Sequence, residues 1–310
     1  MAQPARPTTK GNTVIMATSR TYRYRVVDVF TTEPFEGNAL AVFPDSSGID
    51  DATMQRIARE LNLSETTFVA PATRADCVAQ VRIFTPAREM VFAGHPTVGT
   101  SFVLLAEGIV AKKKERFCLE EKIGAVPIRV DPGERPLIWL STPPIRCGRT
   151  YERVLCARVL GLDVKELLEI PPQYVSAGNP TIFIGVRDKA AVDRAWLDLA
   201  GLRALKGEEA EPMCAFVFAA TAEGAYSRMF APEYGIAEDP ATGSSTGPLA
   251  SYMMKHGLIS GAAGTRAVSE QGTKMGRRSI LHVQIRGEQG ADGIDVGGHV
   301  TPVSEATMRF

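Results

Sequence analysis

The chain has 310 residues, enough for two domains of ordinary size with a buried core in each. It contains 35 basic and 35 acidic residues, so its formal charge is zero and bulk electrostatics favour neither nucleic acid nor an anionic membrane as a partner. Hydrophobic residues make up 45% of the chain, and no apolar run reaches the roughly 18 residues of a membrane helix. These values predict a folded, cytoplasmic protein whose partner is a small molecule.

The cysteine and histidine patterns indicate neither a disulfide framework nor a metal site. The five cysteines are an odd number, and no two of them form a C-x-x-C pair. The four histidines form no H-x-x-x-H or H-x-x-E-H pattern. No G-x-G-x-x-G dinucleotide loop or P-loop is present either. We therefore expect no metal and no cofactor, and thiols that are buried or incidental.

The first half of the chain predicts mostly strands, after a polar extension at residues 1–20. Runs rich in aromatic, apolar and β-branched residues, separated by turn signals, indicate the strands. Residues 50–62 carry apolar side chains at helical spacing behind two acidic residues, which indicates an amphipathic helix. The strands predicted in this half are 22–30, 39–43, 66–70 and 78–84.

The most informative feature of the sequence is an internal repeat, a pattern that occurs once in each half and that we call the echo. In the first half, a strand and an F-T-P turn precede H-P-T-V-G at residues 95–99 and an apolar helix predicted at 98–106. In the second half, a strand and F-A-P precede D-P-A-T-G at residues 239–243 and an apolar helix predicted at 246–255. The two copies are 144 residues apart at the His/Asp position (239 − 95). A single repeat of this length predicts a duplicated domain rather than a solenoid.

The echo and the strand content together predict the fold class. Helices do not alternate regularly with strands, which disfavours a doubly wound parallel sheet, and a helix that is apolar on all sides is normally buried. We expect an α+β fold of two similar domains, each an antiparallel or mixed sheet curled around one central buried helix. Prolines and glycines cluster at 130–144, so the N-terminal domain is predicted at 21–135 and the C-terminal domain at 136–298. The tail at 299–310 is a candidate to return to the first domain.

The two [H/D]-P-x-x-G turns are candidate functional sites. Each carries a polar residue, His95 or Asp239, followed by a proline, which suits a first helical turn because it lacks an amide donor. The glycines and serines at 243–247 leave backbone amides free, and such amides at a helix N-terminus bind carboxylates. Helix capping explains either turn alone. Two matching turns in a duplicated fold are expected to face each other across a cleft.

Glu65 is a candidate acid/base. It enters a strand among uncharged residues, and desolvation there would raise its pKa so that it accepts and donates a proton near neutrality. A solvated glutamate at a strand edge is the simpler alternative, because glutamate is mostly exposed in proteins.

Six segments, in this order, resemble the PhzF family of phenazine-biosynthesis-like proteins. They are DVFTTEPFEGNALAVF, NLSETTFV, AGHPTVGTS, VSAGNPTIFI, EDPATGSSTGPLA and SEQGTKMGRRS. The resemblance runs from about Tyr22 to the C-terminus, and its specificity comes from the combination. It implies the diaminopimelate epimerase fold, with two similar domains and an active site between them, and a homodimer. The implied fold agrees with the duplication in the sequence.

The resemblance also implies an activity and the residues that carry it. The founding activity of the family is the isomerisation of trans-2,3-dihydro-3-hydroxyanthranilate without a cofactor, in which one glutamate moves a proton between two carbons. This glutamate falls on Glu65, the family's histidine on His95 and its aspartate on Asp239. The substrate-binding positions fall on Gly94, Gly243 and Ser244. Ser245 stands where many members have alanine, a difference expected to reshape the pocket only slightly.

A serine hydrolase is one alternative. Residues 243–247 match G-x-S-x-G around Ser245, and three potential triad partners follow in the expected order. The motif requires a strand directly before the turn, and the preceding strand is predicted to end near Phe230. No H-G-G-G loop is present either, which disfavours this function. The potential partners are Asp292, Asp295 and His299.

Two further alternatives use the same fold. An amino-acid epimerase would use Glu65 with His95 or Asp239 as opposed bases and return the proton to the same carbon. An epimerase of the two-thiol type is disfavoured, because the cysteines lie outside both turns. A non-catalytic binding protein also remains open, because fold does not determine function. Our principal prediction is a cofactor-independent isomerase of a small unsaturated carboxylic or amino acid, with Glu65 as the acid/base.

Overall fold

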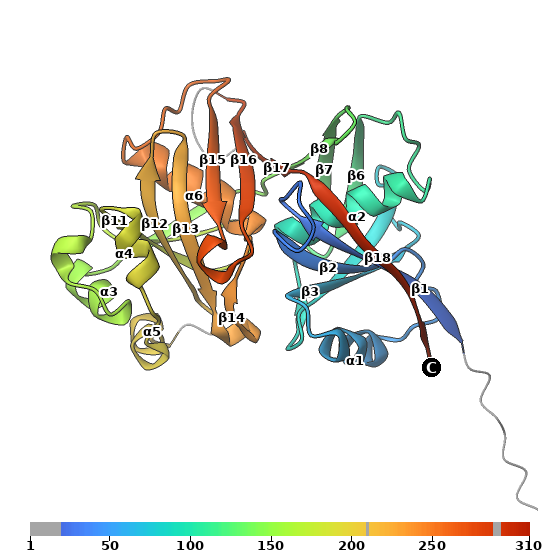
Figure 1. Cartoon of the computed structure of the whole chain (residues 1–310), viewed down its shortest axis with the longest axis horizontal. Coiled ribbons are helices and arrows are strands. Elements are labelled where there is room, and N and C mark those ends of the chain that lie inside the picture. The colour runs from blue at the N-terminus through green and yellow to red at the C-terminus, as the bar shows by residue number, and fades with distance from the viewer. Residues whose placement is uncertain (1–19, 209–210, 288–292) are drawn as a thin grey trace, which may run out of the picture.

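The computed structural model describes residues 20–208, 211–287 and 293–310, which form two lobes side by side (Figure 1). The extension expected at 1–20 lies outside the described residues except for its last residue. The N-terminal lobe contains β1 (Thr21–Val29), β2 (Asn38–Phe43), α1 (Asp51–Leu61), β3 (Glu65–Ala70), β4 (Ala79–Phe84), β5 (Glu89–Met90), α2 (Gly94–Ala106), β6 (Arg116–Glu121), β7 (Gly124–Asp131) and β8 (Leu137–Ser141).

The C-terminal lobe is larger and carries additional short helices on its outer side (Figure 1). It contains β9 (Arg146–Thr150), α3 (Arg153–Val159), β10 (Gln173–Ser176), β11 (Thr181–Val186), α4 (Lys189–Arg194), α5 (Leu199–Lys206), β12 (Cys214–Thr221), β13 (Gly224–Ala231), β14 (Ile236–Asp239), α6 (Gly243–Lys255), β15 (Arg266–Gln271), β16 (Ser279–Ile285) and β17 (Ile294–Gly298). Three 3₁₀ helices, Val164–Glu166, Pro232–Tyr234 and Thr273–Met275, join these elements, and β18 (Val300–Arg309) ends the chain. No helix in the described ranges is both long enough and apolar enough to cross a membrane.

The four strands and the amphipathic helix predicted in the first half form within one residue of their expected limits. Helix α1 is capped at its N-terminus by Asp50, whose carboxylate accepts the Thr53 N–H at 2.8 Å, and it ends at Asn62 in the left-handed conformation. The two apolar helices begin earlier than predicted, because their first turns are polar and carry no hydrophobic signal. In α2 this turn includes Pro96, which needs no amide partner there.

The echo in the sequence corresponds to a repeated pattern of strand pairing. In the N-terminal lobe, β3 and β4 pair antiparallel, α2 follows, and β6 returns parallel to β4. In the C-terminal lobe, β12 and β13 pair antiparallel, α6 follows, and β15 returns parallel to β13. The predicted α+β class, with mixed sheets curled around two central helices, is confirmed.

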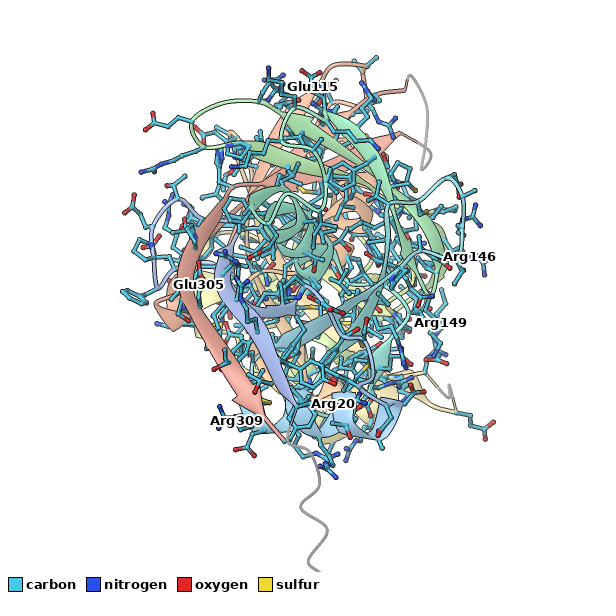
Figure 2. All side chains as sticks on the ribbon, turned by 90° about the vertical axis from the view of Figure 1, so that its right-hand side faces the viewer. Arg20, Glu115, Arg146, Arg149, Glu305 and Arg309 are labelled. Carbon is cyan, nitrogen blue, oxygen red and sulfur yellow. The ribbon has the colours of Figure 1, made fainter. Side chains whose placement is uncertain are left out.

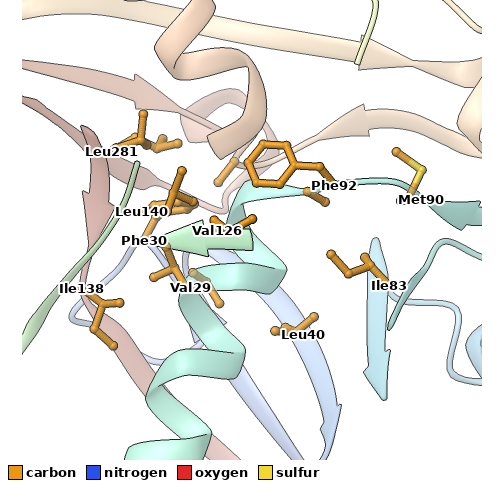
Figure 3. Close-up of a cluster of buried hydrophobic side chains, with 14 of the residues drawn as sticks. Val29, Phe30, Leu40, Ile83, Met90, Phe92, Val126, Ile138, Leu140 and Leu281 are labelled. Atoms are coloured by element: carbon orange, nitrogen blue, oxygen red, sulfur yellow. The ribbon is translucent and has the colours of Figure 1, made fainter. Parts of the chain in front are cut away.

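Both central helices are buried on nearly all sides, as their apolar composition predicts. Eleven of the 13 residues of α2 are buried, and so are ten of the 13 residues of α6. Figure 3 shows Val29 and Leu40 packed beside α2 within the cluster that also contains Phe92. Burial of one such aliphatic side chain stabilises the fold by about 1.5–3 kcal/mol. The packing around the rest of each helix therefore fixes the position of its polar first turn.

Two strand pairings connect the lobes. Strand β8 of the first lobe pairs antiparallel with β17 of the second, with Trp139 opposite Gly297. The chain then returns as β18, which pairs antiparallel with β1 from Thr21–Arg309 to Val29–Val300. Figure 2 shows this two-stranded ribbon, with Arg20 and Arg309 at its end.

A buried ion pair also fastens the lobes together. The Asp28 side chain on β1 is 3% exposed and accepts a hydrogen bond from Arg277 Nη2 at 2.6 Å. Its other oxygen accepts the Phe35 N–H at 2.6 Å, and Arg277 Nε donates to Gly37 O at 3.0 Å. One arginine of the second lobe thus holds both the end of β1 and the loop that follows it.

We predict that Arg277→Ala lowers the free energy of unfolding by about 2–3 kcal/mol, because the buried Asp28 carboxylate loses its counter-ion. The neighbouring Arg278 is the matched control: its side chain is 51% exposed and pairs with Glu270 at 3.4 Å. Removing an exposed pair costs less than about 1 kcal/mol. Urea unfolding of both variants measures the difference, and equal losses would contradict the assignment.

Candidate active site

The N-termini of α2 and α6 meet between the lobes. A Cβ atom added to Gly94 would collide with the backbone of Gly243 and Ser244. A Cβ atom added to Gly243 would lie 3.0 Å from Gly94 Cα and 3.0 Å from the Phe30 ring. The two glycines are thus required by this contact. The first amides of each helix have no partner within their own helix, and both helix dipoles direct their positive ends into the same space.

A small pocket lies beside this junction. Of the six predicted site residues, Glu65, Asp239 and Ser244 line it, while Gly94, His95 and Gly243 are buried but are not among its lining residues. Its volume of about 30 Å³ leaves room for about two water molecules, so an organic acid enters only when the walls move apart. The remaining lining residues are Thr85, Met90, Asn179, Cys214, Met229, Ala231, Tyr234, Ile236 and Thr242.

Glu65 is a buried carboxyl at the start of β3. Its side chain is 9% exposed, which rules out the alternative of a solvated glutamate at a strand edge. Burial raises the pKa of Glu65 well above its ordinary value of 4.5, and the nearby negative charge of Asp239 raises it further. Glu65 can therefore both hold and release a proton near neutral pH.

Asn38 fixes the protonation of His95. The Asn38 amide nitrogen donates to Asp239 Oδ1 at 2.7 Å and to Ala241 O at 3.0 Å, and it lies 3.2 Å from His95 Nδ1. The reversed amide would turn its oxygen toward a carboxylate and a carbonyl, so this orientation is the favourable one. The two hydrogens of this amide nitrogen are shared among the three neighbours, and the nitrogen itself cannot accept, so a proton on His95 Nδ1 would point at a group that only donates. His95 Nδ1 is therefore the unprotonated nitrogen.

The proton of neutral His95 consequently lies on Nε2. This atom is 3.3 Å from Glu65 Oε2, but the two do not form a hydrogen bond, and neither atom has a hydrogen-bond partner among the described residues. Burial lowers the pKa of His95 to about 3, so the ring is neutral at physiological pH. His95 thus places a neutral ring beside Glu65 without bringing a positive charge that would lower the pKa of Glu65.

Asp239 is the second carboxyl of the pocket. It accepts hydrogen bonds from Asn38 and from the Thr242 hydroxyl, and the Ser64 side chain also bonds to it. Burial nevertheless raises its pKa to about 6. Gln271 holds the turn, because its amide donates to Asp239 O at 2.7 Å and its oxygen accepts the Thr242 N–H at 3.1 Å.

Helix capping does not explain either turn. The N-cap residues are Ala93 for α2 and Thr242 for α6, and neither helix has a side-chain cap hydrogen bond. His95 lies within the first turn of α2, whereas Asp239 ends β14, three residues before the cap of α6. Both side chains are therefore available to the pocket network.

Ser244 and Asn179 form the opposite side of the pocket. Asn179 Nδ2 donates to Ser244 Oγ at 3.0 Å and to Phe92 O, in the other lobe, at 3.1 Å. The next residue, Ser245, is 1% exposed, and its hydroxyl forms a hydrogen bond with the Thr181 hydroxyl at 3.1 Å. Ser245 is not among the residues that line the pocket, so its exchange for alanine would leave the lining unchanged.

The alternative of a serine hydrolase is not supported. The prediction that the preceding strand ends near Phe230 is wrong, because β14 follows and ends at Asp239. Residues 240–242 still separate this strand from Gly243, so no strand lies directly before the G-x-S-x-G turn. Ser245 is also buried within α6 and bonded to Thr181, whereas His299 Nδ1 lies 3.2 Å from Pro136 O. Asp295 bonds to Ser141, and residue 292 lies outside the described ranges. The described residues of the potential triad are thus engaged elsewhere.

Cys214 lines the pocket, although the sequence separates it from both turns. It is buried, and burial together with the negative charges of Asp239, Glu233 and Glu65 raises the pKa of its thiol. The sulfur therefore keeps its proton and does not act as a thiolate base. Within the described ranges, no cluster of three His, Cys, Asp or Glu side chains is arranged to hold a metal ion.

Sequence reasoning did not single out Asn38 and Asn179, although both lie in segments that carry the family resemblance. Each follows a glycine with positive φ at the end of a turn, Gly37 and Gly178. The two asparagines are 141 residues apart (179 − 38), close to the 144 that separate His95 and Asp239. A search of the duplicated halves for repeated G-N pairs would have found them.

A further buried carboxyl, Glu121, contacts Thr97 near the start of α2. Its Oε1 contacts Thr97 Oγ1, and the same hydroxyl lies 2.7 Å from Ala93 O. A threonine hydroxyl has one hydrogen, and a carbonyl oxygen only accepts. The arrangement is satisfied when Thr97 donates to Ala93 and a protonated Glu121 donates to Thr97. Burial raises the pKa of Glu121 to about 8, in agreement with this assignment.

We predict that Glu121→Gln removes a pH dependence of stability. A carboxyl whose folded pKa is raised from 4.5 to about 8 stabilises the fold fully below 4.5, and this contribution is lost as the pH rises toward 8. The wild type should therefore lose stability relative to Glu121→Gln across this window. Urea unfolding at several pH values measures the difference, and a constant difference would contradict the assignment.

Comparisons with known proteins show the family of the chain. The model of the family described as "phenazine biosynthesis-like protein" (PhzC–PhzF) matches residues 27–306. A Pseudomonas aeruginosa protein named trans-2,3-dihydro-3-hydroxyanthranilate isomerase is 34% identical over 286 residues, covering 92% of this chain and 98% of the relative.

Solved structures give the same result. A predicted epimerase from Pseudomonas aeruginosa is 30% identical, with a TM-score of 0.78, and a PhzF-family phenazine biosynthesis protein from Bacillus anthracis is 25% identical, with a TM-score of 0.82. Each match covers 93% of this chain and 99% of the solved one. The expected epimerase-like fold is confirmed. With the family model matching most of its length, the chain belongs to the phenazine biosynthesis-like (PhzC–PhzF) family.

Proposed function

We propose that the protein is a cofactor-independent isomerase that moves a proton between two carbon atoms of a small unsaturated carboxylic or amino acid. The observation that carries this proposal is the buried Glu65 carboxyl, whose raised pKa suits both uptake and release of a proton. The name of the Pseudomonas aeruginosa relative makes trans-2,3-dihydro-3-hydroxyanthranilate the first substrate to test.

The junction of the two helices supports binding of an acid. The free amides of the first turns and the two helix dipoles favour a carboxylate beside Gly94, Gly243 and Ser244. The pocket also holds two carboxyl groups, which would repel an anion if both were charged. Their raised pKa values lower this repulsion, because burial favours the neutral form of each carboxyl.

In the proposed reaction, the Glu65 carboxylate removes a proton from one carbon of the substrate. The electron pair of the broken C–H bond is delocalised over the unsaturated acid, and the protonated Glu65 then returns the proton to a different carbon. No atom is gained or lost. The neutral His95 ring lies beside Glu65 during both steps, and Asp239 opposes the charged form of Glu65.

An amino-acid epimerase is the second candidate, because the pocket contains two carboxyls with raised pKa values, Glu65 and Asp239. Opposed bases of this kind could remove a proton from one face of a carbon and return it to the other. In D₂O, an epimerase leaves deuterium on the original carbon and inverts it, whereas the isomerase places deuterium at a new position.

The homodimer, the cytoplasmic location and the domain limits at 21–135 and 136–298 stay predictions. They follow from the family resemblance and from the composition of the chain, and the reaction proposed above does not depend on them. Sedimentation of the purified protein tests the dimer directly.

We predict that Glu65→Gln lowers turnover by about 10²- to 10⁴-fold, because the amide can neither accept nor return the proton. The measurement is proton NMR of trans-2,3-dihydro-3-hydroxyanthranilate in D₂O, which follows loss of substrate signals and deuterium uptake. Glu60→Gln, on the exposed face of α1, is the control with the same chemical change and should match the wild type. Turnover by Glu65→Gln at the wild-type rate would exclude the proposed base.

We predict that the acid limb of the pH–rate profile lies clearly above the value of about 4.3 of a solvated glutamate. Activity should fall as the pH decreases, because protonated Glu65 cannot accept a proton. Asp239→Asn removes the charge that raises the pKa of Glu65, so it should shift the titration of Glu65 to lower pH. Carbon NMR of labelled glutamate reads this titration even where the variant is inactive. An unchanged or higher pKa would contradict the coupling.

A further inference from the structure

Two of the free cysteines, Cys77 and Cys118, lie side by side in the N-terminal lobe. Cys77 lies two residues before the start of β4, and Cys118 is in β6, which pairs parallel with β4 at Ala79–Leu119. The Val78 N–H donates to Cys118 O at 2.8 Å, so Val78 lies opposite Cys118 and Cys77 is its diagonal neighbour. The two side chains are close enough for Cys77 to raise the pKa of Cys118. A diagonal neighbour, about 4.8 Å across and one residue along, has a Cα separation of about 6 Å, within the range that a disulfide spans.

The surroundings give the two sulfurs different roles. Both side chains are half-buried, which leaves them reachable by a small oxidant. The positively charged Arg74 guanidinium lies close to the Cys77 side chain. Asp76, which pairs with Arg74 at 2.9 Å, partly offsets this charge. Burial and the contact with Cys77 raise the pKa of Cys118 to about 12, so Cys118 keeps its proton.

We propose that Cys77 and Cys118 form a reversible intramolecular disulfide when the protein is exposed to a peroxide. The Cys77 sulfur attacks one oxygen of hydrogen peroxide, which breaks the O–O bond and gives a sulfenic acid and water. The Cys118 sulfur then attacks the sulfenic sulfur, and the departing hydroxide takes the Cys118 proton as a second water. Two thiols are oxidised and one peroxide is reduced. A thiol reductant reverses the reaction.

The disulfide would close the chain from residue 77 to residue 118, a segment that contains β4, β5 and α2. Closing a loop of this length constrains the unfolded chain and is expected to raise the thermal midpoint by several degrees. Neither cysteine lines the pocket of Glu65 and Asp239. The proposal therefore stands independently of the proposed function.

The test starts from fully reduced protein treated with a small excess of hydrogen peroxide. The intact mass should decrease by about 2 Da, the mass of two hydrogens. After alkylation and digestion with trypsin without reductant, peptide 75–82 (ADCVAQVR) should be linked to peptide 117–122 (FCLEEK). Dithiothreitol should release both peptides, and the oxidised protein should melt at a higher temperature than the reduced one.

Three serine variants complete the design. Cys77→Ser and Cys118→Ser should lose the linked peptide and the rise in melting temperature, whereas Cys147→Ser, which removes an exposed cysteine of β9, should retain both. In Cys118→Ser, Cys77 should accumulate as a sulfenic acid that dimedone labels. Over-oxidation of Cys77 in the wild type without the link, or linkage of either cysteine to Cys147, would overturn the proposal.

Discussion

The structure depends on the direct contact between the N-termini of two buried helices. Helices rarely meet in this way, because both ends carry unpaired amides and the positive end of a dipole. Here Gly94 and Gly243 remove the side chains that would keep the backbones apart. The strands curled around α2 and α6 hold the two ends against each other. The resulting concentration of positive potential and unpaired donors is a property of the assembled pair, which neither helix has alone.

Burial then determines the chemistry at this junction. Two carboxyls and one imidazole lie within the network, and desolvation is the largest cause of every resolved pKa shift among them. It raises the pKa values of Glu65 and Asp239 and lowers that of His95, so each neutral form is favoured relative to its form in water, while Asp239, with a pKa of about 6, still carries charge at neutral pH. Within a pocket that shields these groups from water, a proton can move between carboxyl and substrate without creating a strongly solvated charge. Cys214 follows the same rule and stays a thiol.

The duplication extends to the residues that join the lobes. Asn38 is the first residue of β2, and its amide donates hydrogen bonds to Asp239 and Ala241 in the second lobe. Asn179, in the corresponding turn before β11, reaches across to Phe92 in the first lobe. Two similar halves thus exchange equivalent hydrogen bonds across the junction. The groups that differ between the halves are the ones with acid or base chemistry. Only the first half supplies Glu65, and the two turns carry different side chains, His95 in the first and Asp239 in the second.

The amino-acid sequence by itself determined the local elements, the duplication and the family. Periodicity and turn residues predicted β1 to β4 and α1 within one residue, and the echo of H-P-x-x-G with D-P-x-x-G predicted two equivalent helix starts. Only the tertiary structure decided that Asn38 selects the tautomer of His95, that Glu121 lies behind α2 and that Cys77 lies beside Cys118. Each of these relations joins residues at least 24 positions apart in the chain. Local sequence patterns report backbone preference and burial on one element, whereas protonation states and side-chain pairs depend on which groups folding brings into a shared, water-poor space.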